Sequence, residues 1–132
     1  MANIEGMSSK KVISSPDAPQ AVGPYSQGIR AGDFVFLAGQ IPTIPATGQF
    51  PEGIAAQTEQ VIANIKALLA AEGLTLANVV KASVFLADLA EFAGMNEVYA
   101  KHFPEPYPAR STFQVAGLPK AARVEIEVIA RA

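Results

Sequence analysis

The chain has 132 residues, of which half are apolar and 17% are charged, and its formal net charge is -2. This length corresponds to one domain that buries roughly two thirds of the surface of its unfolded chain, and the net charge argues against a nucleic-acid partner. With no cysteine, one histidine and no apolar run of the roughly 18 residues that span a bilayer, the sequence excludes disulfides and the common zinc sites and favours a soluble, cytoplasmic protein without membrane contact.

The first part of the chain predicts short strands separated by loops. Residues 1–9 are small and polar, which is typical of a flexible N-terminal arm, and 10–132 form the predicted domain. Short apolar runs predict three strands, at 10–14, 25–30 and 34–38. The last two flank the glycine-containing turn at 31–33, so we expect them to form a hairpin. Prolines and glycines mark 15–24 and 41–53 as loops.

Two segments have the periodicity of amphipathic helices. In 54–72 the apolar residues fall on one face, followed by Gly73 as a cap; they are Ile54, Val61, Ile62, Ile65, Leu68 and Leu69. The other face of this helix is polar and carries Gln57, Glu59, Gln60, Asn64 and Lys66. The second helix is expected at 91–103, with an apolar stripe of Phe92, Met95, Val98 and Tyr99.

Three further strands are expected, at 79–87, 111–115 and 123–130. The first is apolar throughout, which suggests burial on both faces. The last alternates cleanly and places Glu125 and Glu127 on one face, either a functional pair or an ordinary solvated face. The element order is β-ββ-α-β-α-β-β, with too few helices to cover both sides of a sheet. We therefore predict an α+β fold in which two helices pack on one face of a mixed sheet.

Arg110 lies where a stiff loop meets a predicted strand. Three prolines within 104–108 hold the loop extended, so the backbone can aim the guanidinium at an anion. If the strands at 111–115 and 123–130 are neighbours, Arg110 and Glu125 approach one cleft. The structural alternatives are an arginine that only solvates a strand end and a salt bridge between these two side chains.

Other polar residues stand near loop and strand ends. Tyr25 follows a Gly-Pro pair, Gly39 ends a predicted strand, and Asn96 lies on the second helix. Tyr25 could instead pack as a core ring with its hydroxyl at the rim, and Asn96 could be an ordinary polar helix residue. His102 lacks the surroundings of a catalytic triad, so we expect it at the surface or at a helix end.

Six short motifs follow one another along the chain. They are Gly23-Pro24-Tyr25-Ser26-Gln27-Gly28, Ala38-Gly39-Gln40-Ile41-Pro42, Pro45-Ala46-Thr47-Gly48, Met95-Asn96-Glu97-Val98-Tyr99, Pro108-Ala109-Arg110-Ser111 and Val124-Glu125-Ile126-Glu127. In this order and spacing they make the chain, from 11 to 131, similar to the Rid family. These are the reactive intermediate deaminases formerly called YjgF, and the resemblance is to the deaminating, RidA-like members.

The resemblance implies a homotrimer with a chorismate-mutase-like α+β fold and clefts between subunits. It implies hydrolysis of 2-imino acids such as 2-iminobutanoate and 2-iminopropanoate, which dehydratases dependent on pyridoxal phosphate release, to 2-keto acids and ammonia. By the same resemblance Arg110 binds the substrate carboxylate and Glu125 is associated with the attacking water. The cleft would be lined by Tyr25, Gly39, Asn96 and the backbone N–H of Thr112. Many relatives have cysteine at the position of Thr112, so a thiol role is lost here.

The residues suit this chemistry. A planar guanidinium such as that of Arg110 engages a carboxylate bidentately, which lysine cannot do. A carboxylate such as Glu125 can activate water and return the proton to the departing amine. Because the imine is already electrophilic, we expect no metal and no organic cofactor. The alternatives are a non-enzymatic, small-ligand-binding or chaperone-like trimer and an endoribonuclease; the acidic net charge argues against the latter.

Overall fold

The computed structural model describes residues 9–132, so nearly all of the predicted arm at 1–9 lies outside the described residues. The elements are β1 (Lys11–Ile13), β2 (Gly28–Ala31), β3 (Phe34–Leu37), α2 (Ile54–Ala70), β4 (Val79–Leu86), α3 (Phe92–His102), β5 (Ala109–Gln114) and β6 (Val124–Arg131). This order confirms the predicted one. Within 9–132, no helix combines the length and the apolar character needed to cross a bilayer.

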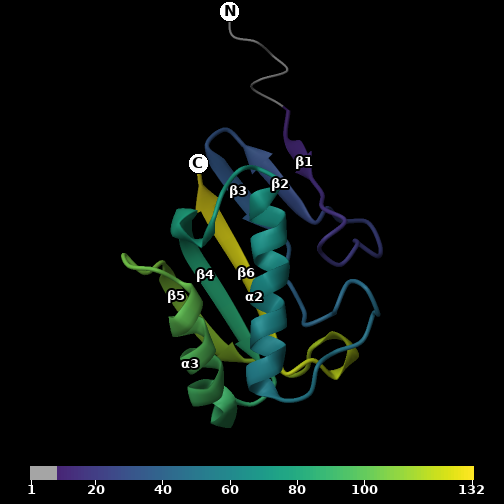
Figure 1. The fold of residues 1–132 in the computed structure, drawn as a ribbon, viewed down its shortest axis with the longest axis vertical. Helices are drawn as coiled ribbons and strands as arrows, with labels where there is room; N and C mark the ends of the chain where they lie inside the picture. The colour runs from purple at the N-terminus through teal and green to yellow at the C-terminus, as the bar shows by residue number, and fades with distance from the viewer. Residues whose placement is uncertain (1–8) are drawn as a thin grey trace, which may run out of the picture.

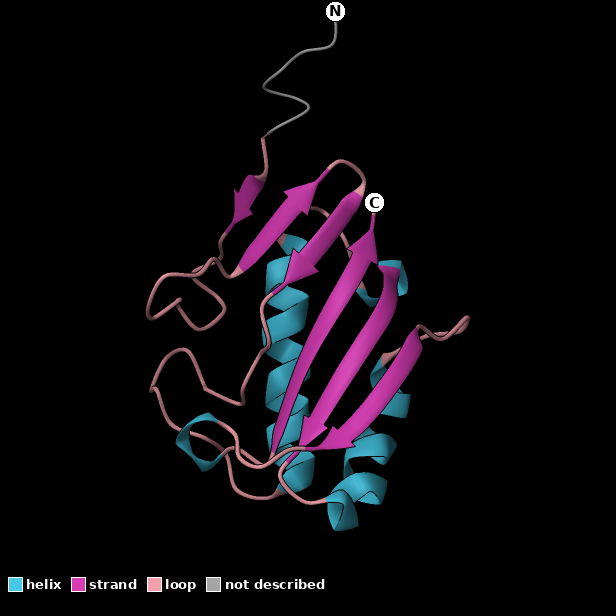
Figure 2. Ribbon diagram, turned by 180° about the vertical axis from the view of Figure 1, so that it is seen from behind, coloured by secondary structure: helices cyan, strands magenta, loops and turns pink. Residues whose placement is uncertain are grey.

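The strands form one six-stranded sheet in the order β1-β2-β3-β6-β4-β5. Strands β4 and β5 are parallel, and all other neighbours are antiparallel. Figure 1 shows α2 and α3 over one face of the sheet, and the view from behind in Figure 2 shows the opposite face without a helix in the described part of the chain. The predicted mixed sheet with both helices on one face is therefore confirmed.

The core lies between the helices and the sheet. Five residues of α2 are fully buried there: Val61, Ile62, Ile65, Leu68 and Leu69. Each such side chain contributes about 1.5–3 kcal/mol on burial, so this face, rather than helix propensity, holds α2 in place. Gly73 follows the helix with a φ of 71°, and the N–H of Leu74 donates to the Leu69 carbonyl at 3.0 Å, which is the glycine end predicted for this helix.

Strand β4 is buried on one face only, so the prediction of burial on both faces is wrong for the described chain. Ala82, Val84 and Leu86 are fully buried under the helices, whereas Val80 is 44% exposed. The apolar residues on the second face lie on the side of the sheet that carries no helix. The face of the sheet without helices is therefore exposed and can contact another protein surface.

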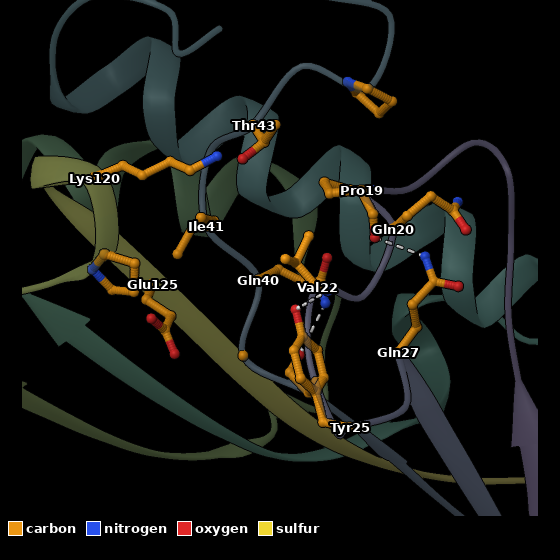
Figure 3. Close-up of a pocket in the computed structure, with 14 residues that line it drawn as sticks. Pro19, Gln20, Val22, Tyr25, Gln27, Gln40, Ile41, Thr43, Lys120 and Glu125 are labelled. Carbon is orange, nitrogen blue, oxygen red and sulfur yellow. Dashed lines mark hydrogen bonds between the residues drawn. The ribbon is translucent and has the colours of Figure 1, made fainter. Parts of the chain in front are cut away.

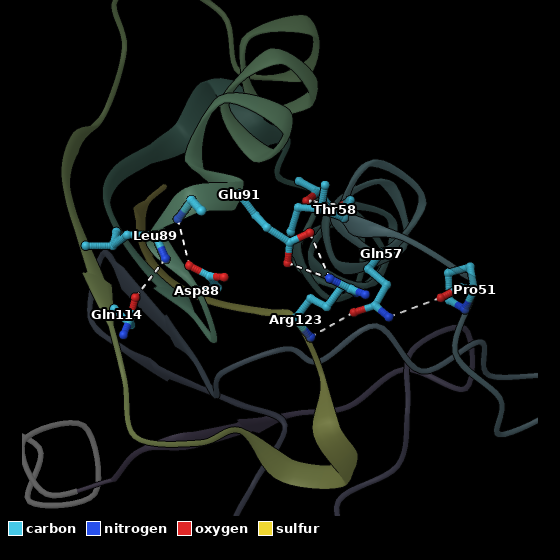
Figure 4. A network of polar contacts seen from close by, with 10 residues as sticks. Pro51, Gln57, Thr58, Asp88, Leu89, Glu91, Gln114 and Arg123 are labelled. Atoms are coloured by element: carbon cyan, nitrogen blue, oxygen red, sulfur yellow. Dashed lines mark hydrogen bonds and ion pairs between the residues drawn. The ribbon is translucent and has the colours of Figure 1, made fainter.

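Two polar residues of α2 are buried rather than solvated. The Nδ2 of Asn64 donates to the carbonyl oxygens of Ile41 at 3.1 Å and Thr43 at 3.0 Å. The Nε2 of Gln57 donates to the Pro51 carbonyl at 3.1 Å (Figure 4). The polar face of the predicted helix thus binds the loop at 41–53, whose backbone groups need partners once they are covered.

Arg123, the residue directly before β6, is tied to α2 and to Glu91, the residue directly before α3. The N–H of Arg123 donates to Oε1 of Gln57 at 2.9 Å, and its guanidinium Nη1 lies 2.8 Å from both carboxylate oxygens of Glu91 (Figure 4). Nearby, Oε1 of Gln114 at the end of β5 accepts a hydrogen bond from the Leu89 N–H at 2.9 Å. These contacts fix the end of the sheet from which Glu125 projects.

Candidate active site

Arg110 and Glu125 lie on opposite faces of the sheet. The hypothesis that their strands are neighbours is wrong, because β4 pairs with both β5 and β6 and lies between them. Arg110 is level with Ala82, which is buried under the helices, whereas Glu125 is level with Phe85 on the face without helices. One subunit therefore does not bring the two side chains into one cleft, and the alternative of a salt bridge between them is also wrong.

Arg110 packs against α3. Its Nη1 donates to Oδ1 of Asn96 at 2.7 Å, and its Cζ lies 4.6 Å from the centroid of the Tyr99 ring and 5.5 Å from that of Phe92. Arg110 forms no ion pair with any residue between 9 and 132. It is thus neither a freely solvated arginine nor a neutralised one, and Asn96 is not an ordinary polar helix residue.

Thr112 lies two residues after Arg110 on the same face of β5. It is level with Val84 and partly buried. Among the strands of residues 9–132, β5 is at the edge of the sheet and pairs with β4 alone, so the N–H groups on its outer side can donate to a ligand. The geometry is compatible with a carboxylate held by a guanidinium and a backbone donor.

Glu125 lies at a second site, a cavity of about 730 Å³ formed by the loops around the ends of β2, β3 and β6. Tyr25 and Gly39 also line it. Figure 3 shows Glu125 and Lys120 on one side of the cavity, with Tyr25 and Gln27 across from them. Three of the predicted site residues therefore meet here, without Arg110.

The Glu125 carboxylate lies directly against Gly39. A Cβ at Gly39 would clash with Oε2 of Glu125 and lie 2.9 Å from its Cδ, so only glycine leaves this carboxylate its place. The next residue, Gln40, fixes the glycine: its N–H donates to the Ile126 carbonyl at 2.8 Å, and its own carbonyl accepts from the Ile126 N–H at 3.1 Å. These two hydrogen bonds hold the segment after β3 against β6, and thereby hold Gly39 beside the Glu125 carboxylate.

Burial raises the pKa of Glu125, and the neighbouring Glu127 carboxylate raises this pKa further. No residue between 9 and 132 donates a hydrogen bond to Glu125, and none forms an ion pair with it. A carboxylate in this state accepts a proton more readily than an ordinary glutamate, as a general base requires. In the same part of the chain, no group of three or more histidine or acidic side chains is placed to hold a metal ion.

Tyr25 stands at the wall of this cavity with 54% of its surface exposed, so the alternative of a core ring is wrong. Its hydroxyl accepts a hydrogen bond from the Val22 N–H at 3.3 Å. Gln27, which is buried, donates from Nε2 to the Pro19 carbonyl at 2.7 Å and accepts from the Ser15 N–H at 3.0 Å. Gln27 thereby holds the loop that carries Tyr25.

Comparisons with known proteins identify the family. The endoribonuclease L-PSP family model matches residues 15–132. The chain is 53% identical over 122 residues to the chloroplastic reactive intermediate deaminase A of Arabidopsis thaliana. The matched region covers 92% of this chain and 65% of the plant protein. The chain belongs to the Rid family. It is also 46% identical over 122 residues to the 2-iminobutanoate/2-iminopropanoate deaminase of Bos taurus, with 92% and 89% of the two chains covered.

The fold agrees with this membership. The crystal structure of Escherichia coli TdcF with bound serine matches this Rid chain with a TM-score of 0.88 and 44% identity, covering 92% of this chain and 98% of that one. The expected Rid fold and the resemblance to reactive intermediate deaminases are both confirmed. The roles of the individual residues stay predictions.

The six predicted site residues of this Rid chain lie in two separate sets. One set lies where α3 meets β5 and contains Asn96, Arg110 and Thr112; the other lines the cavity and contains Tyr25, Gly39 and Glu125. Sequence reasoning assigned no role to Gln27, Gln40 and Lys120, which also line the cavity. Gln27 and Gln40 stand inside the quoted motifs, so they could have been found there. Lys120 could not, because nothing local predicts its left-handed backbone, with a φ of 56°.

Proposed function

We propose that this Rid protein hydrolyses 2-imino acids, including 2-iminobutanoate and 2-iminopropanoate, to 2-keto acids and ammonia. The observation that carries this proposal is the combination of a fixed guanidinium without an ion-pair partner among residues 9–132, Arg110, and a carboxylate of raised pKa, Glu125. One group suits the carboxylate of the substrate and the other suits the attacking water. A relative that is 46% identical and is named for this reaction supports the choice of substrate.

The two groups would meet between subunits. The face of the sheet without helices exposes Phe34 (43%), Phe36 (43%) and Phe113 (55%), and exposed apolar surface of this kind favours contact with a second copy. Contact through this face and the β5 edge would place Arg110 of one subunit opposite Glu125 of its neighbour. We therefore propose active sites at the clefts of a homotrimer. The trimer and the cytoplasmic location are predictions from the family resemblance and the composition.

In the proposed reaction, the substrate carboxylate accepts two in-plane N–H groups of Arg110 and a backbone N–H near Thr112. Glu125 takes a proton from water while the water oxygen bonds to C2 of the imine. It returns this proton to the imine nitrogen, which gives a carbinolamine with a hydroxyl and an amino group on C2. Glu125 then takes the hydroxyl proton and passes it to the amino nitrogen, the C2–N bond breaks, and ammonia leaves. The water oxygen remains on C2 as the ketone. Holding both reactants in this geometry replaces an encounter in solution, which is a large part of such catalysis.

A coupled assay tests the proposal. Threonine dehydratase releases the imine, and semicarbazide traps it unless the Rid protein hydrolyses it first. We expect the protein in catalytic amounts to lower the imine adduct and to raise free 2-ketobutanoate. Arg110→Ala should abolish this effect, whereas Arg30→Ala should keep it, because Arg30 pairs with Glu72 at 3.3 Å, away from both sets of site residues. An unchanged adduct with an intact oligomer would contradict the proposal.

That negative result would favour the non-enzymatic alternative, in which the same clefts bind small carboxylates or partner segments. The ribonuclease alternative, which the family description names, has a separate signature. Binding of single-stranded RNA should weaken steeply as salt rises, since phosphate contacts release counterions. Imine hydrolysis in a small cleft should change little over the same range. Comparing both activities at low and physiological ionic strength separates the two functions.

A further inference from the structure

Tyr99 lies between Arg110 and a second aromatic ring. It is 5% exposed, and its ring stacks on Phe103 with a centroid distance of 4.1 Å and an interplanar angle of 16°. The Cζ of Arg110 lies 4.6 Å from the centroid of the Tyr99 ring. Tyr99, near the end of α3, thus contacts both the guanidinium and the Phe103 ring.

The Tyr99 ring holds the guanidinium without neutralising it. An aromatic face attracts a cation but forms no ion pair with it. Asn96 takes one donor of Nη1, at 2.7 Å. A carboxylate partner would have neutralised the charge, but the ring and the amide hold Arg110 and keep it cationic. The remaining in-plane donors fit a bidentate carboxylate.

The contact of Tyr99 with Arg110 is made by the ring and not by a hydrogen bond of the hydroxyl. This hydroxyl is the one buried side-chain polar atom within 9–132 that lacks a hydrogen-bond partner. Phenylalanine would fill the same space without leaving a polar atom unpaired, and an unpaired buried hydroxyl is unfavourable. Burial raises the pKa of the Tyr99 phenol, and the nearby charge of Arg110 opposes this rise.

We propose that Tyr99 is a positioning residue for the deamination proposed above. Its ring, which contacts the guanidinium, holds Arg110 where it receives the carboxylate of the substrate. This inference rests on the proposed function, because Arg110 is the anchor there. It adds a residue that touches no reacting atom and acts only through the guanidinium.

The test compares variants by two readouts, steady-state imine hydrolysis and calorimetric binding of the product 2-ketobutanoate. For Tyr99→Leu we expect kcat/KM to fall about tenfold, mainly through KM, and product binding to weaken by a similar factor. Tyr99→Phe keeps the ring and should retain both constants. Phe103→Leu is the matched control: it removes the other ring of the stack and leaves the ring that contacts Arg110.

A coupling measurement separates positioning from simple packing. In an Arg110→Lys background the planar group is already gone, so Tyr99→Leu should lower kcat/KM and product binding little further. Full additivity of the two changes would overturn the proposal, as would equal losses in Tyr99→Leu and Phe103→Leu. A loss in Tyr99→Phe as large as in Tyr99→Leu would assign the role to the hydroxyl instead.

A second variant and a second readout keep the role of Tyr99 testable. If Tyr99→Leu does not assemble, Tyr99→Met removes the ring face with a flexible apolar side chain of better fit. If the wild type shows no imine hydrolysis, the proposed function fails, and product binding still decides the role of Tyr99. Unchanged binding of 2-ketobutanoate by an assembled variant without the ring refutes it.

Discussion

Mixing two inactive variants would test whether each active site is shared between subunits. Arg110→Ala lacks the anchor but keeps Glu125, and Glu125→Gln lacks the base but keeps Arg110. Because β4 lies between their strands and their registers place the two side chains on opposite faces of the sheet, neither residue can complete a site with the other in its own chain. A mixed oligomer should therefore recover activity that both parents lack.

The size of the recovery follows from the closed symmetry of the oligomer. A site is complete only when its arginine comes from a Glu125→Gln chain and its glutamate from an Arg110→Ala chain. In a random equimolar mixture this holds for about one site in four, whatever the number of subunits in the ring. We expect about a quarter of the wild-type kcat per site, with KM close to that of the wild type.

The assay uses the two variants with different tags, refolded together and tested by trapping of the imine with semicarbazide. Native mass spectrometry measures the fraction of mixed oligomers. Wild type mixed with the Arg110→Ala/Glu125→Gln double variant is the calibration, since about a quarter of its sites also remain complete. Mixed oligomers that are no more active than their parents would refute the shared site and the mechanism built on it.

Four further predictions follow from the described contacts. Arg110→Lys should lower kcat/KM about a hundredfold, or about 2.7 kcal/mol, while Arg30→Lys changes little; a near-native Arg110→Lys would refute the bidentate anchor. Gly39→Ala should lower kcat, because its Cβ displaces the Glu125 carboxylate, and unchanged kinetics would contradict that contact. The raised pKa of Glu125 means that its protonated form contributes stability below the unfolded-state pKa, and that this contribution is lost as pH rises through the folded-state pKa. Glu125→Gln should therefore increase Tm at pH 8 but not at pH 4 in calorimetry, and equal effects at both values would argue against a destabilising carboxylate. Asn64→Ala should destabilise the fold by about 1–3 kcal/mol in urea unfolding, because two buried carbonyls lose their donor.

The local patterns of the sequence were sufficient to predict the helices and strands but not which strands lie side by side in the sheet. The spacing of apolar residues located α2 and α3, and the alternation at 123–130 assigned the faces of β6, because these features depend on residues close in the chain. Nothing in that alternation indicates which strands lie beside β6. The insertion of β6 between β3 and β4 is a property of the whole sheet, and it overturned the expected contact of Arg110 with Glu125.

The candidate active site was predicted only in part, because local patterns do not show which distant residues meet. The proline-rich loop drew attention to Arg110, although the contacts that hold its guanidinium come from α3. The motifs marked Tyr25 and Gly39, which the structure brings together with Glu125. In the sequence, Tyr99 belongs to an apolar stripe and to one of the six motifs, and neither gave it a role at the site. Its contact with Arg110 requires α3 to lie along β5, which no local pattern specifies.

The separation of Arg110 and Glu125 has a chemical advantage in the proposed mechanism. Had the fold placed them together in one subunit, they would form an ion pair that neutralises the anchor and lowers the pKa of the base. On opposite faces, Arg110 stays cationic against rings and an amide, and burial keeps the pKa of Glu125 raised. The two groups would then face each other only across the cleft that admits the substrate. Catalysis would depend on assembly, and a dissociated subunit, although folded, should be inactive.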